Sequence, residues 1–338
     1  MFARFAFIFL SLALAIPASA DDKKPMILGV IERKDPAFDA IIPKDAALEI
    51  IAGGFDWSEG PVWVPEKDGG HLLFSDIPKN TIWKWSAKDG LKEFLKPSGY
   101  TGAEKFTGKE PGSNGLALDK EGKLILCQHG DRRLSRLVEG KFVTLVDKFE
   151  GKRLNSPNDL TFKKNGDIYF TDPPYGLPDQ MKDKGKELDF QGVYRLTPKG
   201  ELTLLTKEMT RPNGIAFSPD EKTLYVANSD PDSAIWKAFP VKEDGTLDAG
   251  KVFFDTTQSV KDKKPGLPDG MKVDIAGNIF ATGPGGVFVF DKTGKHLGTL
   301  ATGVPTANVG FGDDGSTLYI TADKNLVRVK TTTKGLGF

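Results

Sequence analysis

Apolar and polar residues alternate in short runs along most of the chain, and this period of two is typical of half-buried β-strands. Six of these runs resemble one another and are rich in Tyr, Phe, Ile and Val; they are HLLFSD (71–76), KLILCQ (123–128), DIYFTD (167–172), TLYVAN (223–228), NIFATG (278–283) and TLYITA (317–322). Another apolar run precedes each of them across turn residues such as Asn165-Gly166. Six strand pairs are therefore predicted, at 60–85, 115–137, 159–196, 214–238, 270–290 and 308–329.

The strand pairs also share a polar residue at one position. Four residues before an apolar residue of the first strand, five of the six pairs carry a side-chain oxygen, which belongs to Glu59, Asn114, Asn158, Asn213 or Asp269. These positions are separated by 55, 44, 55 and 56 residues. Such intervals match the length of one four-stranded propeller blade with variable loops.

The sequence thus predicts an all-β fold, a six-bladed β-propeller that forms a single domain over residues 47–338. A propeller must close its ring, and we expect the apolar run 48–51 to add a strand to the blade built from residues 307–329. A linear array of β repeats is the alternative, but neither end of the chain carries a polar capping repeat. Residues 21–46 are polar and contain proline, so they are expected to form a loosely held N-terminal leader.

The first 20 residues have the order of a secretory signal peptide. Arg4 precedes an apolar run over residues 5–16, and a small-residue cleavage site ends at Ala20. The apolar run of 12 residues is too short to span a membrane. We therefore expect an exported protein, periplasmic or secreted after cleavage following Ala20.

Composition narrows the choice of partners. The chain has 46 Lys and Arg residues and 46 Asp and Glu residues, so it has no basic surplus to attract nucleic acid or anionic lipid. We expect neither a nucleic-acid partner nor, after signal cleavage, a membrane partner, and the oligomeric state stays open. Cys127 is the only cysteine, so one chain can form neither a disulfide nor a thiolate metal site, and Cys127 is expected to be a small buried apolar side chain.

The five oxygen-bearing residues predict a metal site. The innermost strand of each blade runs along the channel of a propeller, so these residues are expected to converge at one end of the axis. Glu59 and Asp269 supply charge and the three asparagines supply neutral carbonyl oxygens, a set that suits one divalent cation, above all Ca²⁺, with Zn²⁺, Mg²⁺ and Mn²⁺ as alternatives. The other interpretation is that Asx residues only open turns before strands. The sixth pair has Ala307 at this position and Asn308 one place later, which is expected to leave room for water or substrate.

Three further residues are candidates for substrate chemistry. His129 follows a second strand near the expected channel mouth, where it could orient substrate or carry a proton; an ordinary solvent-exposed loop histidine is the alternative. Arg132 lies in the same loop and could bind a substrate carboxylate or hydroxyl, or else a carboxylate of the loop. The stretch Pro173-Pro174-Tyr175-Gly176 is expected to form a stiff wall, with Tyr175 stacking on a sugar ring.

Four motifs, in order, are similar to those of one known family. They are SEGPVW (58–63), SPNDLTF (156–162) with YFTDPPYG (169–176), RPNGIAFSPDEKTLYVANS (211–229) and LPDGMKVDIAGNIF (267–280). On these motifs the chain resembles the SMP-30/gluconolactonase/LRE family of six-bladed propellers. The resemblance implies a divalent cation held by Glu59, Asn158, Asn213 and Asp269. It gives Asp269 a second role as general base or nucleophile, and leaves Asn114 as a substrate or second-sphere contact.

The resemblance also implies an activity, namely metal-dependent hydrolysis of a sugar lactone such as gluconolactone. In this interpretation the cation polarises the carbonyl and Asp269 activates the attacking water. A phosphotriesterase-like hydrolase and a propeller that acts only as a binding or scaffold module are the alternatives. One position departs from the family: sugar lactonases of the animal type have an arginine two residues before the asparagine of the third blade, and here that residue is Ser156.

Overall fold

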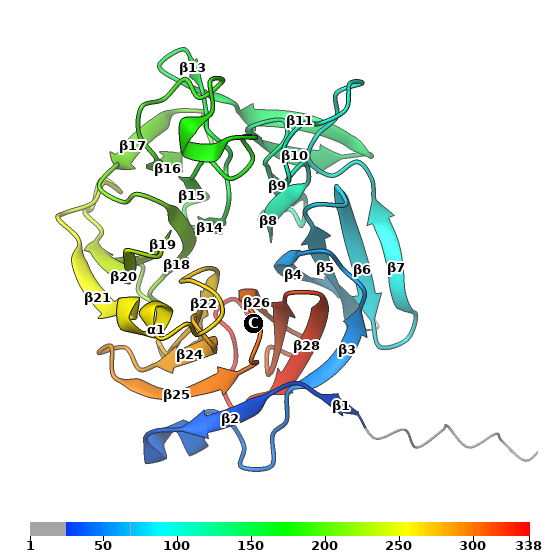
Figure 1. Cartoon of the computed structure of the whole chain (residues 1–338), viewed down its shortest axis with the longest axis vertical. Coiled ribbons are helices and arrows are strands. Elements are labelled where there is room, and N and C mark those ends of the chain that lie inside the picture. Colours follow the sequence, from blue (N-terminus) through cyan, green and yellow to red (C-terminus); the bar gives the residue numbers. More distant parts are fainter. Residues whose placement is uncertain (1–24, 68) are drawn as a thin grey trace, which may run out of the picture.

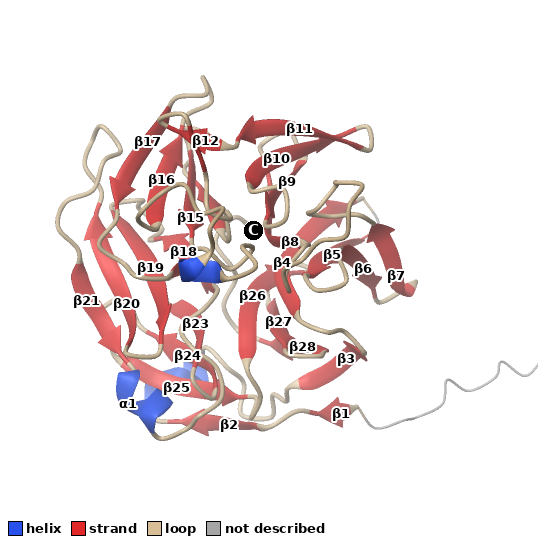
Figure 2. Cartoon of the chain, turned by 45° about the horizontal axis from the view of Figure 1, so that its top comes forward, coloured by secondary structure: helices blue, strands red, loops and turns tan. Residues whose placement is uncertain are grey.

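Each predicted strand pair is part of an antiparallel sheet, and six such sheets stand as blades around a central axis (Figure 1). The computed structural model describes residues 25–67 and 69–338. Regular structure in these residues is almost entirely strand (Figure 2). The strands are, for blade 1, β4 (Ser58–Glu66), β5 (Gly69–Asp76), β6 (Thr81–Ser86) and β7 (Gly90–Leu95); for blade 2, β8 (Ser113–Leu118), β9 (Leu124–Gln128), β10 (Arg133–Val138) and β11 (Lys141–Val146); for blade 3, β14 (Leu160–Phe162), β15 (Ile168–Asp172), β16 (Gly192–Leu196) and β17 (Leu202–Thr206); for blade 4, β18 (Pro212–Phe217), β19 (Thr223–Asp230), β20 (Ser233–Pro240) and β21 (Lys251–Asp255); for blade 5, β22 (Met271–Val273), β23 (Ile279–Gly283), β24 (Gly286–Phe290) and β25 (His296–Ala301); and for blade 6, β26 (Thr306–Gly312), β27 (Thr317–Ala322) and β28 (Asn325–Lys330).

The first strand of every blade lies innermost. Around the axis β4, β8, β14, β18, β22 and β26 each contact the next, and β26 contacts β4. The predicted six-bladed propeller is therefore confirmed. Short helical and strand segments occupy the connections; they are β12 (Lys148–Phe149), β13 (Lys152–Arg153), η2 (Gln180–Lys182) and α1 (Thr257–Lys261).

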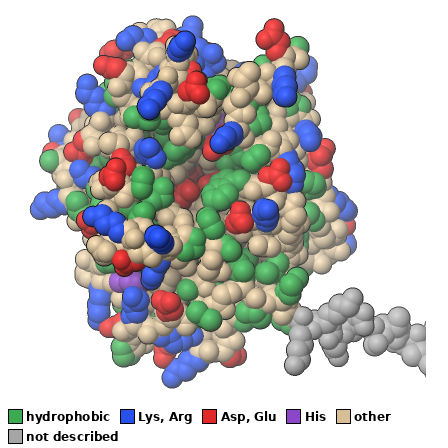
Figure 3. All heavy atoms as spheres, in the orientation of Figure 1, with side chains coloured by type: hydrophobic (Ala, Val, Ile, Leu, Met, Phe, Trp, Pro, Cys, Tyr) green, Lys and Arg blue, Asp and Glu red, His purple; other side chains and the backbone are tan. Residues whose placement is uncertain are grey.

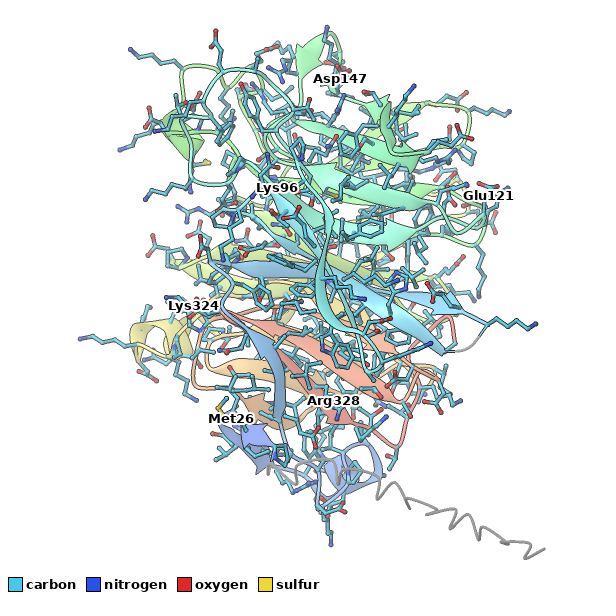
Figure 4. All side chains as sticks on the ribbon, turned by 90° about the vertical axis from the view of Figure 1, so that its right-hand side faces the viewer. Met26, Lys96, Glu121, Asp147, Lys324 and Arg328 are labelled. Atoms are coloured by element: carbon cyan, nitrogen blue, oxygen red, sulfur yellow. The ribbon has the colours of Figure 1, made fainter. Side chains whose placement is uncertain are left out.

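The N-terminal part of the chain closes the ring. Strand β3 (Glu49–Gly53) pairs antiparallel with β28, with Ala52 opposite Leu326, and β1 (Met26–Ile27) pairs with β3. Arg328, labelled in Figure 4, donates a hydrogen bond to Glu49 across this junction at 2.8 Å. The predicted closing strand is thus confirmed, and closure removes the open edge of blade 6.

The expected loosely held leader is wrong for residues 26–42. Strand β2 (Val30–Arg33) adds a fifth strand to blade 5 by pairing with β25. The following turn η1 (Pro36–Ala40) places Phe38 in a core cluster that also contains Ile42 and residues of blades 5 and 6. Both side chains are completely buried, so the segment gains hydrophobic stabilisation by covering the junction of two blades.

Apolar side chains between adjacent blades make up the rest of the core. Cys127 is one of them, packed with Leu134 of its own blade and Phe170 of blade 3, so its predicted buried position is confirmed. The predicted signal peptide, residues 1–20, lies outside the described residues. Within those residues no helix is long and apolar enough to cross a membrane.

Candidate active site

The five oxygen-bearing residues meet at one end of the channel. Glu59 is on β4, Asn114 on β8 and Asn213 on β18, whereas Asn158 and Asp269 lie just before β14 and β22. All five line one cavity of about 510 Å³. Figure 3 shows a hollow near the middle of this face, with acidic side chains at its bottom. In the side view the turn with Lys324 and the turn with Glu121 lie on opposite faces of the ring (Figure 4).

Two kinds of side chain form the walls of the cavity above these residues. Apolar side chains come from several blades; they are Trp57, Ile77, Pro231, Val260, Leu267 and Pro305. Polar groups lie between them, from Glu110, Tyr175, Gln180, Arg211, Ser229 and Thr306. A hollow with apolar walls and a few convergent polar groups is typical of small-molecule sites.

Glycines allow the inner strands to approach closely at this end. A glycine directly follows Glu59, Asn114, Asn213 and Asp269. A Cβ on Gly60 would lie 2.1 Å from the carbonyl oxygen of Asn114, and a Cβ on Gly214 would lie 2.1 Å from that of Asp269. No side chain fits there, so glycine is required by the close packing of neighbouring blades.

Two repeats have a polar residue in place of this glycine; the sequence pattern showed Asn308, but sequence reasoning missed Asp159. Asp159 and Asn308 occupy the equivalent positions, and both are at most 2 % exposed within the channel. Asn308 donates one hydrogen bond to Glu59 at 3.1 Å and another to Asp159 at 3.4 Å. The break in the Glu/Asn/Asp-Gly pattern was the signal that could have identified Asp159.

The three carboxyl groups at the channel end, those of Glu59, Asp159 and Asp269, form no ion pairs among the described residues. Burial raises the pKa of Glu59 to about 8, with a further contribution from the charge of Asp159. Burial also raises the pKa of Asp269, helped by the charge of Glu59, and the pKa of Asp159. Desolvated carboxyl groups that repel one another hold protons unless a cation neutralises them.

This arrangement fits a divalent cation. Asp269 Oδ1 and Asn114 Oδ1 are buried and have no hydrogen-bond donor, so acceptor oxygens are left free beside the carboxyl groups. Among the described residues no group of three or more His, Cys, Asp and Glu side chains forms a metal cluster. A cation here would therefore depend on amide oxygens, as the sequence predicted, and on carboxylates, which suits Ca²⁺.

His129 lies behind the cavity wall. It is completely buried, which excludes the exposed loop histidine considered above. Its Nε2 is 3.1 Å from Asn158 Oδ1 and its Nδ1 is 3.0 Å from a Glu110 carboxylate oxygen. Sequence reasoning missed Glu110, because it belongs to a loop without strand pattern between blades 1 and 2.

Arg132 does not line the cavity, so the predicted substrate contact is wrong. Its Nε donates to the carbonyl oxygens of Leu154 at 2.8 Å and Asn155 at 3.0 Å, and another of its nitrogens donates to Gly185 at 2.9 Å. It therefore braces the backbone around blade 3. The neighbouring Arg133 donates to Gln128 and pairs with Asp131.

Tyr175 lines the cavity, as predicted. Its hydroxyl oxygen is buried without a hydrogen-bond partner. Ser156 supports this wall from behind, donating to the carbonyl oxygen of Pro173 at 2.6 Å and accepting from the amide of Gly176 at 2.9 Å. Ser156 is thus part of the scaffold and does not take the place of the arginine found in animal sugar lactonases.

Comparison with known proteins supports the resemblance stated above. The family model for the SMP-30/gluconolactonase/LRE-like region matches residues 57–324. A gluconolactonase of Zymomonas mobilis is 42% identical over 332 residues, which cover 94% of this chain and 90% of that protein. A pentonolactonase of Haloferax volcanii is 28% identical, with 78% and 80% covered.

A solved structure agrees with these relatives. The gluconolactonase of Xanthomonas campestris superposes with a TM-score of 0.77 at 33% identity, and the match covers 95% of this chain and 99% of that one. The matched region spans the six blades that carry the cavity. The chain belongs to the SMP-30/gluconolactonase/LRE-like family.

Proposed function

We propose that the protein is a metal-dependent lactonase that hydrolyses the ring ester of a sugar lactone, such as gluconolactone. The gluconolactonase relatives support the substrate class. The observation that carries the proposal is the position of Asp269, which lines a cavity large enough for a sugar lactone and whose buried Oδ1 has no hydrogen-bond partner.

The cation is proposed to be Ca²⁺, held by Glu59, Asn158, Asn213 and Asp269 with Asn114 beside them. When bound, it would supply a Lewis acid for the carbonyl oxygen of the lactone. Burial raises the pKa values of Glu59 and Asp269. A bound cation would offset the cost of burying their negative charges.

Asp269 is proposed to act as general base. Its free oxygen takes a proton from water as the water oxygen bonds to the carbonyl carbon. The ring C–O bond then breaks, and the same carboxyl group returns the proton to the alkoxide, which stays tethered to the product as a hydroxyl group. The product is an open-chain aldonic acid, which releases its proton to solvent and becomes the aldonate. His129 contacts Asn158 and does not line the cavity, so it takes no part in proton transfer to or from the substrate.

Arg211 is proposed to hold the sugar. The guanidinium group has neither an ion pair nor a side-chain hydrogen bond within the described residues, although Arg211 lines the cavity. Its donors are therefore available to sugar hydroxyl groups in the cavity. Arg211 lies two residues before Asn213, the asparagine of blade 4, just as Ser156 lies two residues before Asn158, the asparagine of blade 3. The arginine is therefore present in blade 4 and absent from blade 3.

Arg211→Gln is expected to raise KM for gluconolactone by about 10- to 100-fold with little change in kcat, since a hydrogen bond to a charged group contributes about 1.5–3 kcal/mol. Initial rates across a range of lactone concentrations measure both constants. Arg133→Gln is the matched control, because Arg133 bonds to Gln128 and Asp131 outside the cavity. An unchanged KM for Arg211→Gln would contradict the assignment.

The proposed function is tested by a pH-stat assay of the mature protein, stripped of metal and then reloaded with Ca²⁺, Zn²⁺ or Mn²⁺. Ca²⁺-dependent acid release from gluconolactone, above the spontaneous rate, is expected. Aldonolactones of other ring size and a phosphotriester complete the panel. Hydrolysis of the phosphotriester alone would favour the phosphotriesterase, and no turnover of any substrate would favour the binding module.

Export is part of the proposal. It rests on the predicted signal peptide. N-terminal sequencing of protein recovered from the periplasm or the medium is expected to begin at Asp21.

A further inference from the structure

A chain of hydrogen bonds connects three blades along the lining of the cavity. Asn114 Nδ2 donates to Asn158 Oδ1 at 2.8 Å, Asn158 Nδ2 donates to Asn213 Oδ1, and Asn213 Nδ2 donates to Ser229 Oγ at 3.0 Å. Ser229 Oγ in turn donates to the carbonyl oxygen of Pro268. We refer to these four side chains, Asn114, Asn158, Asn213 and Ser229, as the amide relay.

The last acceptor determines the direction of the whole relay. The carbonyl oxygen of Pro268 can only accept, so the Ser229 hydroxyl must donate to it and has only its lone pairs left for Asn213. Asn213 must then turn its NH₂ group to Ser229 and its oxygen to Asn158. Because the Asn213 oxygen can only accept, Asn158 turns its NH₂ group to Asn213, and its own oxygen points away from Asn213.

The oxygen of Asn158 therefore faces His129, and this decides the role of the ring. Asn158 Oδ1 is an acceptor, so the His129 Nε2 atom at 3.1 Å must carry a hydrogen and donate it. The Glu110 carboxyl group lies 3.0 Å from the Nδ1 atom, on the other side of the ring. His129 also packs against Gly176 in the cavity wall: a Cβ atom added to Gly176 would lie 2.7 Å from the Cβ atom of His129. The backbone of Gly176 thus packs directly against the Cβ atom of His129.

We propose that His129 and Glu110 are positioning residues that orient the side-chain amide of Asn158 for the cation. A carbonyl oxygen accepts along two lone-pair directions. The His129 ring donates along one lone-pair direction of Asn158 Oδ1. The other direction, along which Asn114 donates in this structure, is the one that the cation would use. The ring thereby keeps the Asn158 oxygen, and through the relay the Asn213 oxygen, in fixed orientations before a cation binds. This inference rests on the metal site of the proposed function.

The role differs from that of a catalytic residue. His129 does not line the cavity, whereas Asn158 and Glu110 do, so the effect of His129 must pass through the Asn158 amide. Partners of this kind, which orient a ligand without touching the metal, typically change metal affinity by 10- to 100-fold when removed. Glutamine can replace either residue in this task, because its amide offers both a donor and an acceptor, whereas leucine offers neither.

The chain contains a matched control. His71 also pairs with a glutamate, with its Nδ1 atom 2.8 Å from a Glu66 oxygen, and is also buried. It does not contact the amide relay and does not line the 510 Å³ cavity. His71→Leu therefore removes a similar histidine–glutamate pair without changing Asn158.

The first measurement is made on the metal-free protein. The ring nitrogens of its three histidines are observed by ¹⁵N NMR, with the His129 signals assigned by their loss in His129→Gln. A proton on Nε2 of His129 is expected. A ring protonated on Nδ1 alone would overturn the proposal, because it could not donate to Asn158.

The second measurement is calorimetric titration of the metal-free protein and its variants with Ca²⁺. Binding is expected to weaken by about 10- to 100-fold in His129→Leu, to weaken also in Glu110→Leu, and to stay within about threefold of wild type in His129→Gln and His71→Leu. Melting curves without metal identify any variant that is not folded, and His129→Gln then decides the comparison. Wild-type affinity in a folded His129→Leu, or an equal loss in His129→Gln, would overturn the positioning role alone. Failure of the wild type to bind Ca²⁺ would overturn both this role and the metal of the proposed function.

Discussion

Asp269→Asn is expected to lower kcat for lactone hydrolysis by about 10²- to 10⁴-fold, the usual cost of losing a general base. Asparagine has nearly the same shape but no basic oxygen to take a proton from water. Asp269 Oδ1 has no hydrogen-bond donor, so an asparagine amide can turn its oxygen to the cation without breaking an existing contact. The loss should therefore appear in kcat, measured at saturating gluconolactone and Ca²⁺.

Glu59→Gln provides the contrast. Glu59 Oε2 accepts from the amide of Gly60 at 2.7 Å and from Asn308 at 3.1 Å. A glutamine must point its NH₂ group either at these donors or at the cation. We therefore expect Glu59→Gln to weaken Ca²⁺ binding more than Asp269→Asn does.

A control within the same blade separates chemistry from stability. Asp274 is a completely buried carboxylate that accepts hydrogen bonds from the turn at residues 276–278. Asp274→Asn is expected to lower the melting temperature and to leave kcat near that of wild type. If Asp269→Asn with bound Ca²⁺ also keeps near wild-type kcat, Asp269 is not the base and the proposed mechanism is wrong.

The melting temperature of the metal-free protein is expected to fall as the pH rises from about 5 to about 8. Burial raises the pKa of Glu59 to about 8 from an ordinary value of 4.5, so the folded state keeps a proton that the unfolded chain has released. Stability is full below the unfolded pKa and is lost as the pH rises through the folded pKa. A shift of this size corresponds to on the order of 5 kcal/mol across the range.

Saturating Ca²⁺ is expected to remove most of this fall. A divalent cation takes the place of the protons, and a ligand at 1,000 times its Kd stabilises the folded state by about 4 kcal/mol. The difference in melting temperature between Ca²⁺-loaded and metal-free protein should therefore widen from pH 5 to pH 8. Asp172, buried away from the cavity with its pKa raised to about 7 by desolvation, accounts for a remaining slope that Ca²⁺ does not remove.

Differential scanning calorimetry at pH 5, 6, 7 and 8, on desalted metal-free protein with and without added Ca²⁺, measures both effects. Glu59→Gln has no titrating group at this position and should show a flatter profile without metal. A constant difference at every pH, or no stabilisation by Ca²⁺, would contradict the proposed link between the carboxyl groups and the cation.

Local patterns in the sequence determined most of the architecture. Alternation in runs such as TLYVAN (223–228) predicts strands, because one face of a half-buried strand packs on the core and the other faces a more polar environment. Turn residues such as Asn165-Gly166 mark where these strands end. Recurrence of one oxygen-bearing position at blade-length intervals then placed Glu59, Asn158 and Asp269 at one end of the channel. These inferences depend on contacts within a blade and on its repetition, so the sequence alone suffices for them.

Other features depend on contacts between distant parts of the chain. The segment at residues 26–42 is polar enough to suggest a free leader, but Phe38 is buried between blades 5 and 6. Glu110 belongs to a loop without periodicity, and only the folded ring brings it to His129. Arg132 and His129 are three residues apart in one loop, yet one braces backbone carbonyls and the other faces a cavity residue.

The channel shows the same division between local and tertiary information. Asp159 and Asn308 replace the glycine of the repeat, which the sequence displays, but they are separated by 149 residues and meet only because the ring closes. The amide relay likewise takes its direction from the backbone carbonyl of Pro268, which no sequence pattern marks. The sequence determined which oxygen atoms reach the site; the tertiary structure decided how they are oriented, because hydrogen-bond direction depends on neighbours that other blades supply.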